Sequence, residues 1–443
     1  MTTGFASSLA GCGTRTASDP IATAPSGHWP TRDHDSHNTG YSPRATPPEE
    51  KPTVVWRTTE LTRYSDAAVT AGRFSRPTPI VMDGRLFVGG EAITCYDATT
   101  GERQWRCNRD NRFVVGCVHT DRGLCVVERA KTTLSGSYWP RGSFGLVDPA
   151  TGTVEHTVSC GLGPSAPVTD GRLVVVPTQH GHVGFAADGT RRWRVVNENA
   201  TEPPAPAAVT DDSLSLPMPT TVGYYDRTDG WLAHLLPEPT RQWKRRPGPR
   251  RRWRSPVVTG DGVVVPTVRL VNTFEPESSA IAPGLHCFGV DGERRWHRPV
   301  PTKWMTDGGP LGSFEQSVSS PAVADGVGYV VSARIPPRDD GFPERTNTTL
   351  QAFETATGAE RWRRTFPGEG TRAVAPLVAD DRVYVALPLD REGGGTGRVV
   401  AFDTPGDRLW SVDVPGVPVH LAAVGDLLYV TLARGRVIAY GAA

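Results

Sequence analysis

The chain of 443 residues repeats itself, and this repeat limits the folds open to it more than any other feature. Each unit of about 50 residues begins with two apolar segments joined by a tight turn, most clearly at Asp83 and Gly84. An Asp-Gly pair between apolar segments predicts a β-hairpin, because both central residues of a type I′ turn need positive φ. The same half-unit recurs with turns at Asp121, Asp170, Asp211, Asp261, Asp325, Asp380 and Gly425.

The second half of the unit is a strand, a turn of the Asp-x-x-Thr-Gly type, and a strand with an aromatic residue four positions after the glycine. That residue is tryptophan in five copies: Trp105, Trp193, Trp296, Trp362 and Trp410. Two copies have His156 and His234 instead, which we interpret as structural substitutes rather than catalysts. A tryptophan on an outer strand buries about 150–250 Å². We therefore expect these side chains to dock each unit on the next.

Eight first halves against seven second halves leave the last unit one strand short. Residues 53–57, near the N-terminus, form an orphan strand with Trp56 as its docking residue. We predict that this strand completes the last unit, because closing the ring removes sheet edges that would otherwise aggregate. The predicted fold class is all-β: a single eight-bladed β-propeller of four-stranded antiparallel blades over residues 28–443. The 48 Gly and 40 Pro residues suit so many turns and argue against an all-helical protein.

The repeat resembles the tryptophan-docking repeat of the pyrroloquinoline-quinone (PQQ) propellers, with the pattern Ala-x-Asp-x-x-Thr-Gly-x-x-x-Trp. Residues 28–30 (His-Trp-Pro) and 38–43 (Asn-Thr-Gly-Tyr-Ser-Pro) are similar to the N-terminal segment of that superfamily, and the resemblance covers residues 28–441. The superfamily includes quinoprotein alcohol dehydrogenases and BamB-like outer-membrane assembly lipoproteins. The resemblance therefore implies the fold and leaves the function open. This chain resembles the BamB-like lipoproteins more than the quinoprotein dehydrogenases.

Residues 1–27 are interpreted as a truncated signal sequence with a lipobox, followed by a flexible tether. Residues 9–12 read Leu-Ala-Gly-Cys, which resembles the lipobox of prokaryotic lipoproteins and implies lipidation of Cys12. No Lys or Arg precedes Cys12, and the apolar run is short for a signal sequence. We expect an extracytoplasmic protein anchored to the cell membrane through Cys12. A chance match to the lipobox is the alternative.

The longest non-repetitive segments fall on one side of the predicted ring. In a propeller, the turns between first and second strands and between third and fourth strands share one face, and here they are tight. The long segments join second to third strands or one blade to the next, at residues 128–143, 235–254, 267–283, 299–319 and 333–348. Long loops on a rigid scaffold commonly carry function. Our candidate binding residues on this face are Trp139, Arg141, Asn272, Glu275, Trp304, Asp307, Arg338, Asp339 and Asp340.

Residues 241–254 concentrate eight basic residues and two tryptophans in a chain whose net charge is only +1. Such a segment suits a phosphate, a sugar or an anionic lipid headgroup, and a solvated loop between blades is the alternative. The candidate anion patch consists of Arg245, Arg246, Arg250, Arg251 and Arg252. The overall charge balance argues against a specific nucleic-acid binder.

The quinoprotein dehydrogenases imply PQQ and Ca²⁺, held beside a pair of adjacent cysteines and by Glu, Asn and Asp ligands. Here the cysteines after the N-terminal segment are dispersed: Cys95, Cys107, Cys117, Cys125, Cys160 and Cys287. We interpret most of them as small buried apolar residues. Residues 33–37 (Asp-His-Asp-Ser-His) form the densest group of metal-type ligands, but an extended segment packed on the propeller explains them better. We therefore assign no catalytic residue, no metal and no cofactor, since no residue set supports PQQ and calcium.

These observations favour a non-enzymatic, monomeric propeller that binds a protein or glycan partner or serves as a protein-assembly scaffold. A PQQ-dependent oxidoreductase and a propeller that senses a polysaccharide or another ligand remain the alternatives. The sequence identifies neither the partner nor the ligand.

Overall fold

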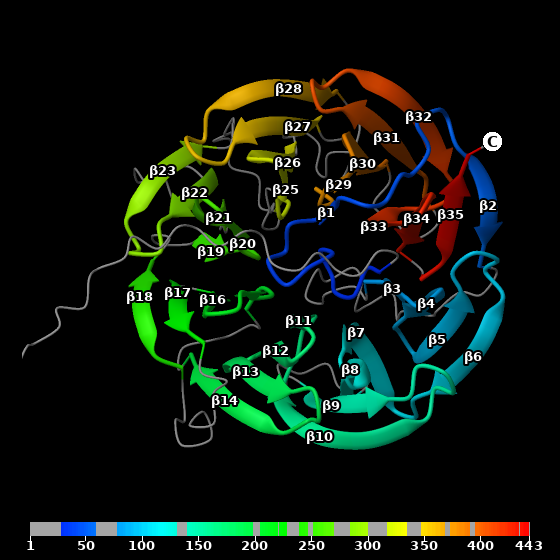
Figure 1. Ribbon diagram of the computed structural model, residues 1–443, viewed down its shortest axis with the longest axis vertical. Coiled ribbons are helices and arrows are strands. Elements are labelled where there is room, and N and C mark those ends of the chain that lie inside the picture. Colours follow the sequence, from blue (N-terminus) through cyan, green and yellow to red (C-terminus); the bar gives the residue numbers. More distant parts are fainter. Residues whose placement is uncertain are drawn as a thin grey trace, which may run out of the picture.

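Apolar segments separated by tight turns form antiparallel hairpins along the whole chain, and these hairpins build eight sheets around a central axis (Figure 1). In this computed structural model, the residues described are 28–58, 78–130, 140–197, 204–219, 221–227, 239–246, 251–269, 284–299, 317–334, 347–367, 373–389, 395–433 and 435–442. All secondary structure in these ranges is β-strand. The predicted all-β, eight-bladed propeller is confirmed.

Blades 1 to 4 follow one another along the chain, each with its strands in sequence order. Blade 1 is β3 (Ile80–Met82), β4 (Arg85–Val88), β5 (Ala92–Asp97) and β6 (Arg103–Asn108). Blade 2 is β7 (Arg112–Thr120), β8 (Gly123–Ala130), β9 (Arg141–Val147) and β10 (Val154–Leu162). Blade 3 is β11 (Val168–Thr169), β12 (Leu173–Thr178), β13 (Gly181–Ala186) and β14 (Arg191–Val196). Blade 4 is β15 (Ala208–Val209), β16 (Ser213–Met218), β17 (Thr221–Asp226) and β18 (Arg241–Arg245).

Blades 5 to 8 repeat the pattern, with the innermost strand split in blades 5 and 6. Blade 5 is β19 (Arg251–Trp253) and β20 (Val257–Thr259), β21 (Gly262–Arg269), β22 (Gly284–Phe288) and β23 (Arg294–Pro299). Blade 6 is β24 (Ser317–Val318) and β25 (Ala322–Ala324), β26 (Val327–Arg334), β27 (Asn347–Glu354) and β28 (Glu360–Phe366). Blade 7 is β29 (Leu377–Ala379), β30 (Arg382–Pro388), β31 (Gly397–Asp403) and β32 (Arg408–Val414), with β1 (Tyr41–Ser42) added parallel to β29. Blade 8 is β33 (Pro418–Val424), β34 (Leu427–Leu432), β35 (Val437–Gly441) and β2 (Thr53–Arg57).

The last blade is completed by the N-terminal strand, as predicted. β2 pairs antiparallel with β35, so that Trp56 lies opposite Ala439. On the other side of this blade, the indole N–H of Trp410 donates to the carbonyl of Pro48 at 3.1 Å. The two ends of the chain therefore meet in one sheet and close the ring (Figure 1).

The tight turns have the backbone that the Asp-Gly pattern requires. Asp83 and Gly84 have φ of 46° and 68°, and Asp325 and Gly326 have 47° and 74°. Positive φ at both central positions is the signature of the type I′ hairpin. These turns leave the first and second strands of a blade in register at its innermost hairpin.

Residues 28–46 run across the central axis and hydrogen-bond to the innermost parts of most blades. The backbone of Trp29 pairs with Val81 in blade 1, and the carbonyls of Thr39 and Gly40 accept from blades 6 and 7. Asn38 is fully buried, and its side-chain amide donates to Ala207 and to Pro256 at 2.7 and 2.9 Å. These contacts fall near the ends of the innermost strands, next to the first tight turn of each blade. The segment therefore occupies the tight-turn end of the axis.

Outer-strand aromatics join neighbouring blades through one repeated contact. The indole of Trp296 in blade 5 donates to the carbonyl of Thr355 in blade 6 at 2.8 Å and lies against Gly358. Gly358 has φ of +73°, and a Cβ there would come within 2.7 Å of the indole. Glycine is therefore required both for the turn and for the close approach of the ring. The same donation from indole to the next blade is made by Trp56, Trp105, Trp243, Trp362 and Trp410.

Blade 4 departs from the predicted spacing. The pattern places His234 at the docking position, four residues after Gly230. In the structure the outer strand of blade 4 is Arg241–Arg245, and Trp243 docks on Gly292 of blade 5. His234 itself lies outside the described residues. Residues 227–240 connect the third and fourth strands here, so counting from the turn glycine selected the wrong residue. The prediction that every such connection is tight, with residues 235–254 on the opposite face, is therefore wrong for residues 235–240.

Candidate functional site

The predicted binding face can be located only through the strands that bracket it. Arg141 is described, and it is exposed at the first position of β9. The other candidates lie outside the described residues: Trp139, Asn272, Glu275, Trp304, Asp307, Arg338, Asp339 and Asp340. The strands on either side show which ends the long connections join. Residues 270–283 and 335–346 link second to third strands, and residues 300–316 link blade 5 to blade 6.

The basic run around residues 241–254 is divided between structural and exposed roles. The guanidinium of Arg245 donates to the carbonyl of Gly292 at 2.9 Å and lies over the ring of Trp243. Arg245 therefore holds blade 4 against blade 5. Arg246 is exposed and Arg252 is half-buried. Arg250 and the side chain of Arg251 lie outside the described part of the chain.

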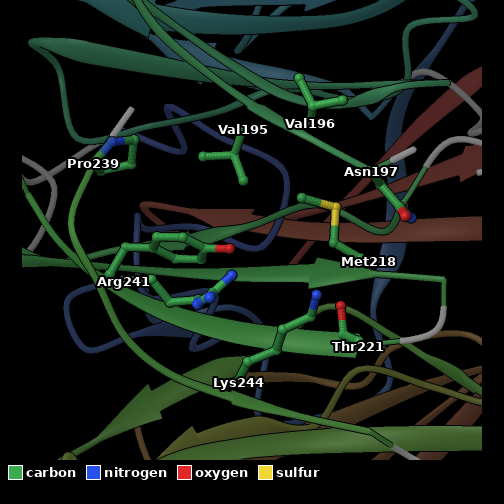
Figure 2. Close-up of a pocket in the computed structure, with 9 residues that line it drawn as sticks. Val195, Val196, Asn197, Met218, Thr221, Pro239, Arg241 and Lys244 are labelled. Atoms are coloured by element: carbon green, nitrogen blue, oxygen red, sulfur yellow. The ribbon is translucent and has the colours of Figure 1, made fainter. Parts of the chain in front are cut away.

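A cavity of about 260 Å³ lies where blade 3 meets blade 4, and we call it the 3/4 seam pocket. Figure 2 shows the side chains of β18 and β17 facing those of β14 across this space. The lining residues are Val195, Val196, Asn197, Met218, Thr221, Tyr225, Pro239, Arg241 and Lys244. Sequence reasoning missed this pocket, because its two cations, Arg241 and Lys244, were part of the basic run but not of the five residues proposed as an anion patch.

The pocket combines a buried base with a charged rim. Val195, Met218, Thr221 and Tyr225 are each at most 6% exposed, whereas Arg241 and Lys244 are exposed. Within the described part of the chain, neither cation has an ion-pair partner. The arrangement can neutralise a negative charge at the rim while placing an attached apolar group against the base.

The polar segment on the axis is a packed structural element, as the sequence interpretation held. Asp33, His34 and His37 are buried at 7%, 2% and 9% exposure. Burial raises the pKa of Asp33, while for Asp35 burial is outweighed by the neighbouring imidazoles of His34 and His37 and by hydrogen bonds from Thr39, which lower its pKa. Among the described residues, no group of three or more His, Cys, Asp or Glu side chains is placed to hold a metal ion.

The cysteines are separate thiols. Five of the six described cysteines are buried, and Cys107 is partly exposed. Burial raises the pKa of Cys117, Cys125 and Cys160 to about 12, which keeps these thiols protonated and poorly nucleophilic at neutral pH. They pack as small apolar side chains, as predicted.

Comparison with known proteins places the chain in a family. The family model described as outer membrane protein assembly factor BamB matches residues 49–196 and 286–443, which is more than half of the chain. The chain belongs to this family. No curated protein matches the chain with significance. The predicted resemblance to BamB-like PQQ-repeat propellers is thereby confirmed.

Solved structures similar to this BamB-like chain include BamB from Moraxella catarrhalis, with 16% identity and a TM-score of 0.54 over 88% of this chain and 98% of that one. A quinohemoprotein alcohol dehydrogenase from Comamonas testosteroni has 14% identity and a TM-score of 0.59 over 95% and 81%. Sqt1 from Saccharomyces cerevisiae has 10% identity and a TM-score of 0.58 over 88% and 99%. At these identities the similarity concerns the fold alone.

The described residues of this BamB-like propeller do not fit the PQQ and calcium site that the dehydrogenases imply. The cysteines that could flank a quinone are dispersed buried thiols. No ligand group for a cation is assembled in the described ranges, and the chain's own residues 28–46 cross the axis. Nor do these ranges include a helix long and apolar enough to cross a membrane.

Proposed function

We propose that this protein is a non-enzymatic, extracytoplasmic scaffold that binds another protein and assists its assembly. The match to the family model of outer membrane protein assembly factor BamB carries this proposal. That description concerns assembly rather than catalysis. It agrees with a chain in which we assign no catalytic residue.

A closed ring suits such a role because it holds a binding surface rigid at little conformational cost. The N-terminal segment occupies the tight-turn end of the axis. The long connections leave from the opposite end, between strands such as β21 and β22 or β26 and β27. We therefore assign partner binding to that end, with Trp304, Asp307, Arg338, Asp339 and Asp340 as the residues to test.

Membrane attachment through Cys12 belongs to the same proposal. A single acyl chain anchors a protein only marginally, so stable attachment requires more than one. Mass spectrometry of the N-terminal peptide from membranes is expected to show a cleaved, acylated Cys12. A Cys12→Ser variant is expected to leave the membrane fraction, and a variant that stayed there unchanged would contradict the anchor.

The partner assignment is tested by crosslinking the full chain in membranes of its own cells and identifying the product by mass spectrometry. A variant carrying Arg338→Glu, Asp339→Lys and Asp340→Lys is expected to lose a defined, stoichiometric crosslink. A matched control with Glu102→Lys and Arg103→Glu, which changes exposed residues at the opposite end, is expected to keep it.

Two outcomes would overturn the proposal. One is a crosslink that survives the triple change on the long-loop end and disappears in the control. The other is reduction of a dye by the purified protein in the presence of PQQ, Ca²⁺ and an alcohol. The second result would assign the chain to the quinoprotein oxidoreductases instead.

A further inference from the structure

The 3/4 seam pocket has a recognition chemistry that is independent of the assembly role. Its walls come from the outer strands of two neighbouring blades, β14 on one side and β17 and β18 on the other. Thr221 begins β17 and Asn197 follows β14, whereas Arg241 begins β18, so the pocket runs along the seam from one end of these strands to the other.

The register of blade 4 explains why both cations face this space. Tyr225 pairs with Arg241 and Gly223 pairs with Lys244, with Gln242 as the extra residue of a β-bulge between these pairs. Residues directly opposite in a sheet share a face, and so do residues two apart on a strand. Arg241, Lys244, Tyr225 and Thr221 therefore project together toward blade 3. Figure 2 shows Lys244 beside Thr221, with Arg241 farther along the same sheet below Val195.

Glycine at position 223 makes room for this cluster. A Cβ on Gly223 would lie 2.5 Å from the ring of Tyr225 and 2.9 Å from its hydroxyl. The phenol therefore lies over Gly223 at the base of the pocket. This buried phenol and the hydroxyl of Thr221 provide polar groups beneath the two cations.

We infer that the 3/4 seam pocket binds an organic carboxylate that carries an apolar substituent of about the size of one amino-acid side chain. An arginine guanidinium matches a carboxylate through two parallel hydrogen bonds, and a lysine adds a second positive charge. The small exposed parts of Val195 and Met218, together with Pro239, then contact the substituent. Such a group occurs in a free organic acid and at the C-terminus of a polypeptide.

Size and lining favour this ligand over the alternatives. The volume of about 260 Å³ is below the roughly 300–1,000 Å³ typical of pockets for drug-sized ligands, so one residue-sized group fits. Inorganic phosphate carries no apolar part to contact Val195 and Met218. A neutral ligand would gain no charge attraction from the two cations and would displace part of their hydration.

The test is calorimetric titration of the full chain with N-acetyl-leucine, using N-acetyl-leucinamide as the uncharged control. We expect the acid to bind at least tenfold more tightly than the amide and more tightly than inorganic phosphate, with affinity falling as salt is added. Arg241→Gln and Lys244→Gln should each weaken binding of the acid about tenfold, since each removes a charge-assisted contact. Arg246→Gln, an exposed basic residue outside the pocket lining, should leave affinity unchanged.

The two sources of carboxylate are distinguished by a pentapeptide that ends in leucine, with a free or an amidated C-terminus. Tighter binding of the free peptide than of N-acetyl-leucine identifies a polypeptide C-terminus, and the reverse identifies a small acid; either supports the inference. Equal binding of acid and amide, phosphate binding as tight as N-acetyl-leucine, or an Arg241→Gln variant with unchanged affinity would overturn it. We expect the variants to fold, because the substituted cations are exposed. Thermal unfolding of each variant checks this.

Discussion

The seams between blades fall into two kinds, and one residue distinguishes them. In blades 4, 5 and 6 the docking tryptophan is followed two positions later by Arg245, Arg298 or Arg364. Each of these arginines donates to the carbonyl of the glycine on which its tryptophan docks in the next blade. The other blades lack this arginine: the equivalent residues are Thr58, Cys107, Val158, Val195 and Val412. The 3/4 seam pocket opens beside one of them, Val195.

The comparison separates two contributions to a seam that the repeat combines in blades 4, 5 and 6. The tryptophan supplies buried area at a seam, and the arginine ties the two blades with hydrogen bonds. Trp193, which is followed by Val195 instead, is only 3% exposed and lies against Gly184 of its own blade. A seam can therefore keep a buried tryptophan without the polar tie.

The largest expected effect is loss of a docking tryptophan. Trp296→Ala removes an indole that is 9% exposed, together with its hydrogen bond to Thr355, and should cost about 3–5 kcal/mol of unfolding free energy. His156→Ala, at the seam between blades 2 and 3, removes an exposed side chain and should cost less than about 1 kcal/mol. Denaturant titration followed by tryptophan fluorescence measures both. Similar losses in the two variants would show that docking is not what stabilises the seams.

The next largest effect concerns the hydrogen bonds that an arginine makes across a seam. Arg298→Met keeps most of the apolar stem but removes the bonds from the guanidinium to Gly358, Gln351 and Glu360, so we expect a loss of about 1–2 kcal/mol. Val195→Met, the matched change at the seam without a tie, should stay within about 1 kcal/mol because the pocket beside it takes up the added volume. Midpoints of thermal unfolding compare them. If Val195→Met were the more damaging change, the distinction between the two kinds of seam would fail.

The smallest effect concerns the turn beneath a docking glycine. The backbone N–H of Thr100 donates to the carboxylate of Asp97, and this bond contributes most to the lowered pKa of Asp97. The hydroxyl of Thr100 donates to the same carboxylate and lowers the pKa further. A lowered folded-state pKa means that Asp97 stabilises the protein above its unfolded pKa, near 3.8, and that this contribution disappears as the pH falls through the folded value.

Because Asp97 is largely solvated, we expect Asp97→Asn to lower the unfolding free energy at pH 7 by less than about 1 kcal/mol. The difference from the wild type should shrink on acidification below pH 3.8. Thermal unfolding at pH 7 and at acidic pH measures this difference, and one that grew on acidification would contradict the role of the carboxylate.

The repeat predicted most of the fold because its signals are local. Asp-Gly turns, turn glycines and the orphan strand at residues 53–57 each specify a backbone geometry that does not depend on distant residues. The spacing failed in blade 4, where a longer connection between the third and fourth strands moved the docking residue to Trp243. The spacing rule counts four residues from the turn glycine, so it selects the wrong residue when additional residues lie between the glycine and the docking tryptophan.

The candidate site was harder to predict because a pocket arises between elements. Nothing in the local sequence of β14 or β18 shows that Val195 and Lys244 lie across one space, since this follows from the ring. The residue two positions after the docking aromatic gives no signal either, since it is valine in blades 2 and 7 as well as in blade 3. The long-loop residues carry no periodic signal, and their assignment stays a prediction.

The closure of blade 8 has a consequence for biosynthesis. Thr58 and Val437 exchange hydrogen bonds although 379 residues separate them in the chain. At about 5–20 residues per second, a ribosome needs roughly 20–80 s between making the two. Strand β2 must wait for that time with its edge unpaired, so the ring can close only after Val437 has been made. During this delay the unpaired edge of β2 must be shielded from other strands, because an open sheet edge can pair with another chain.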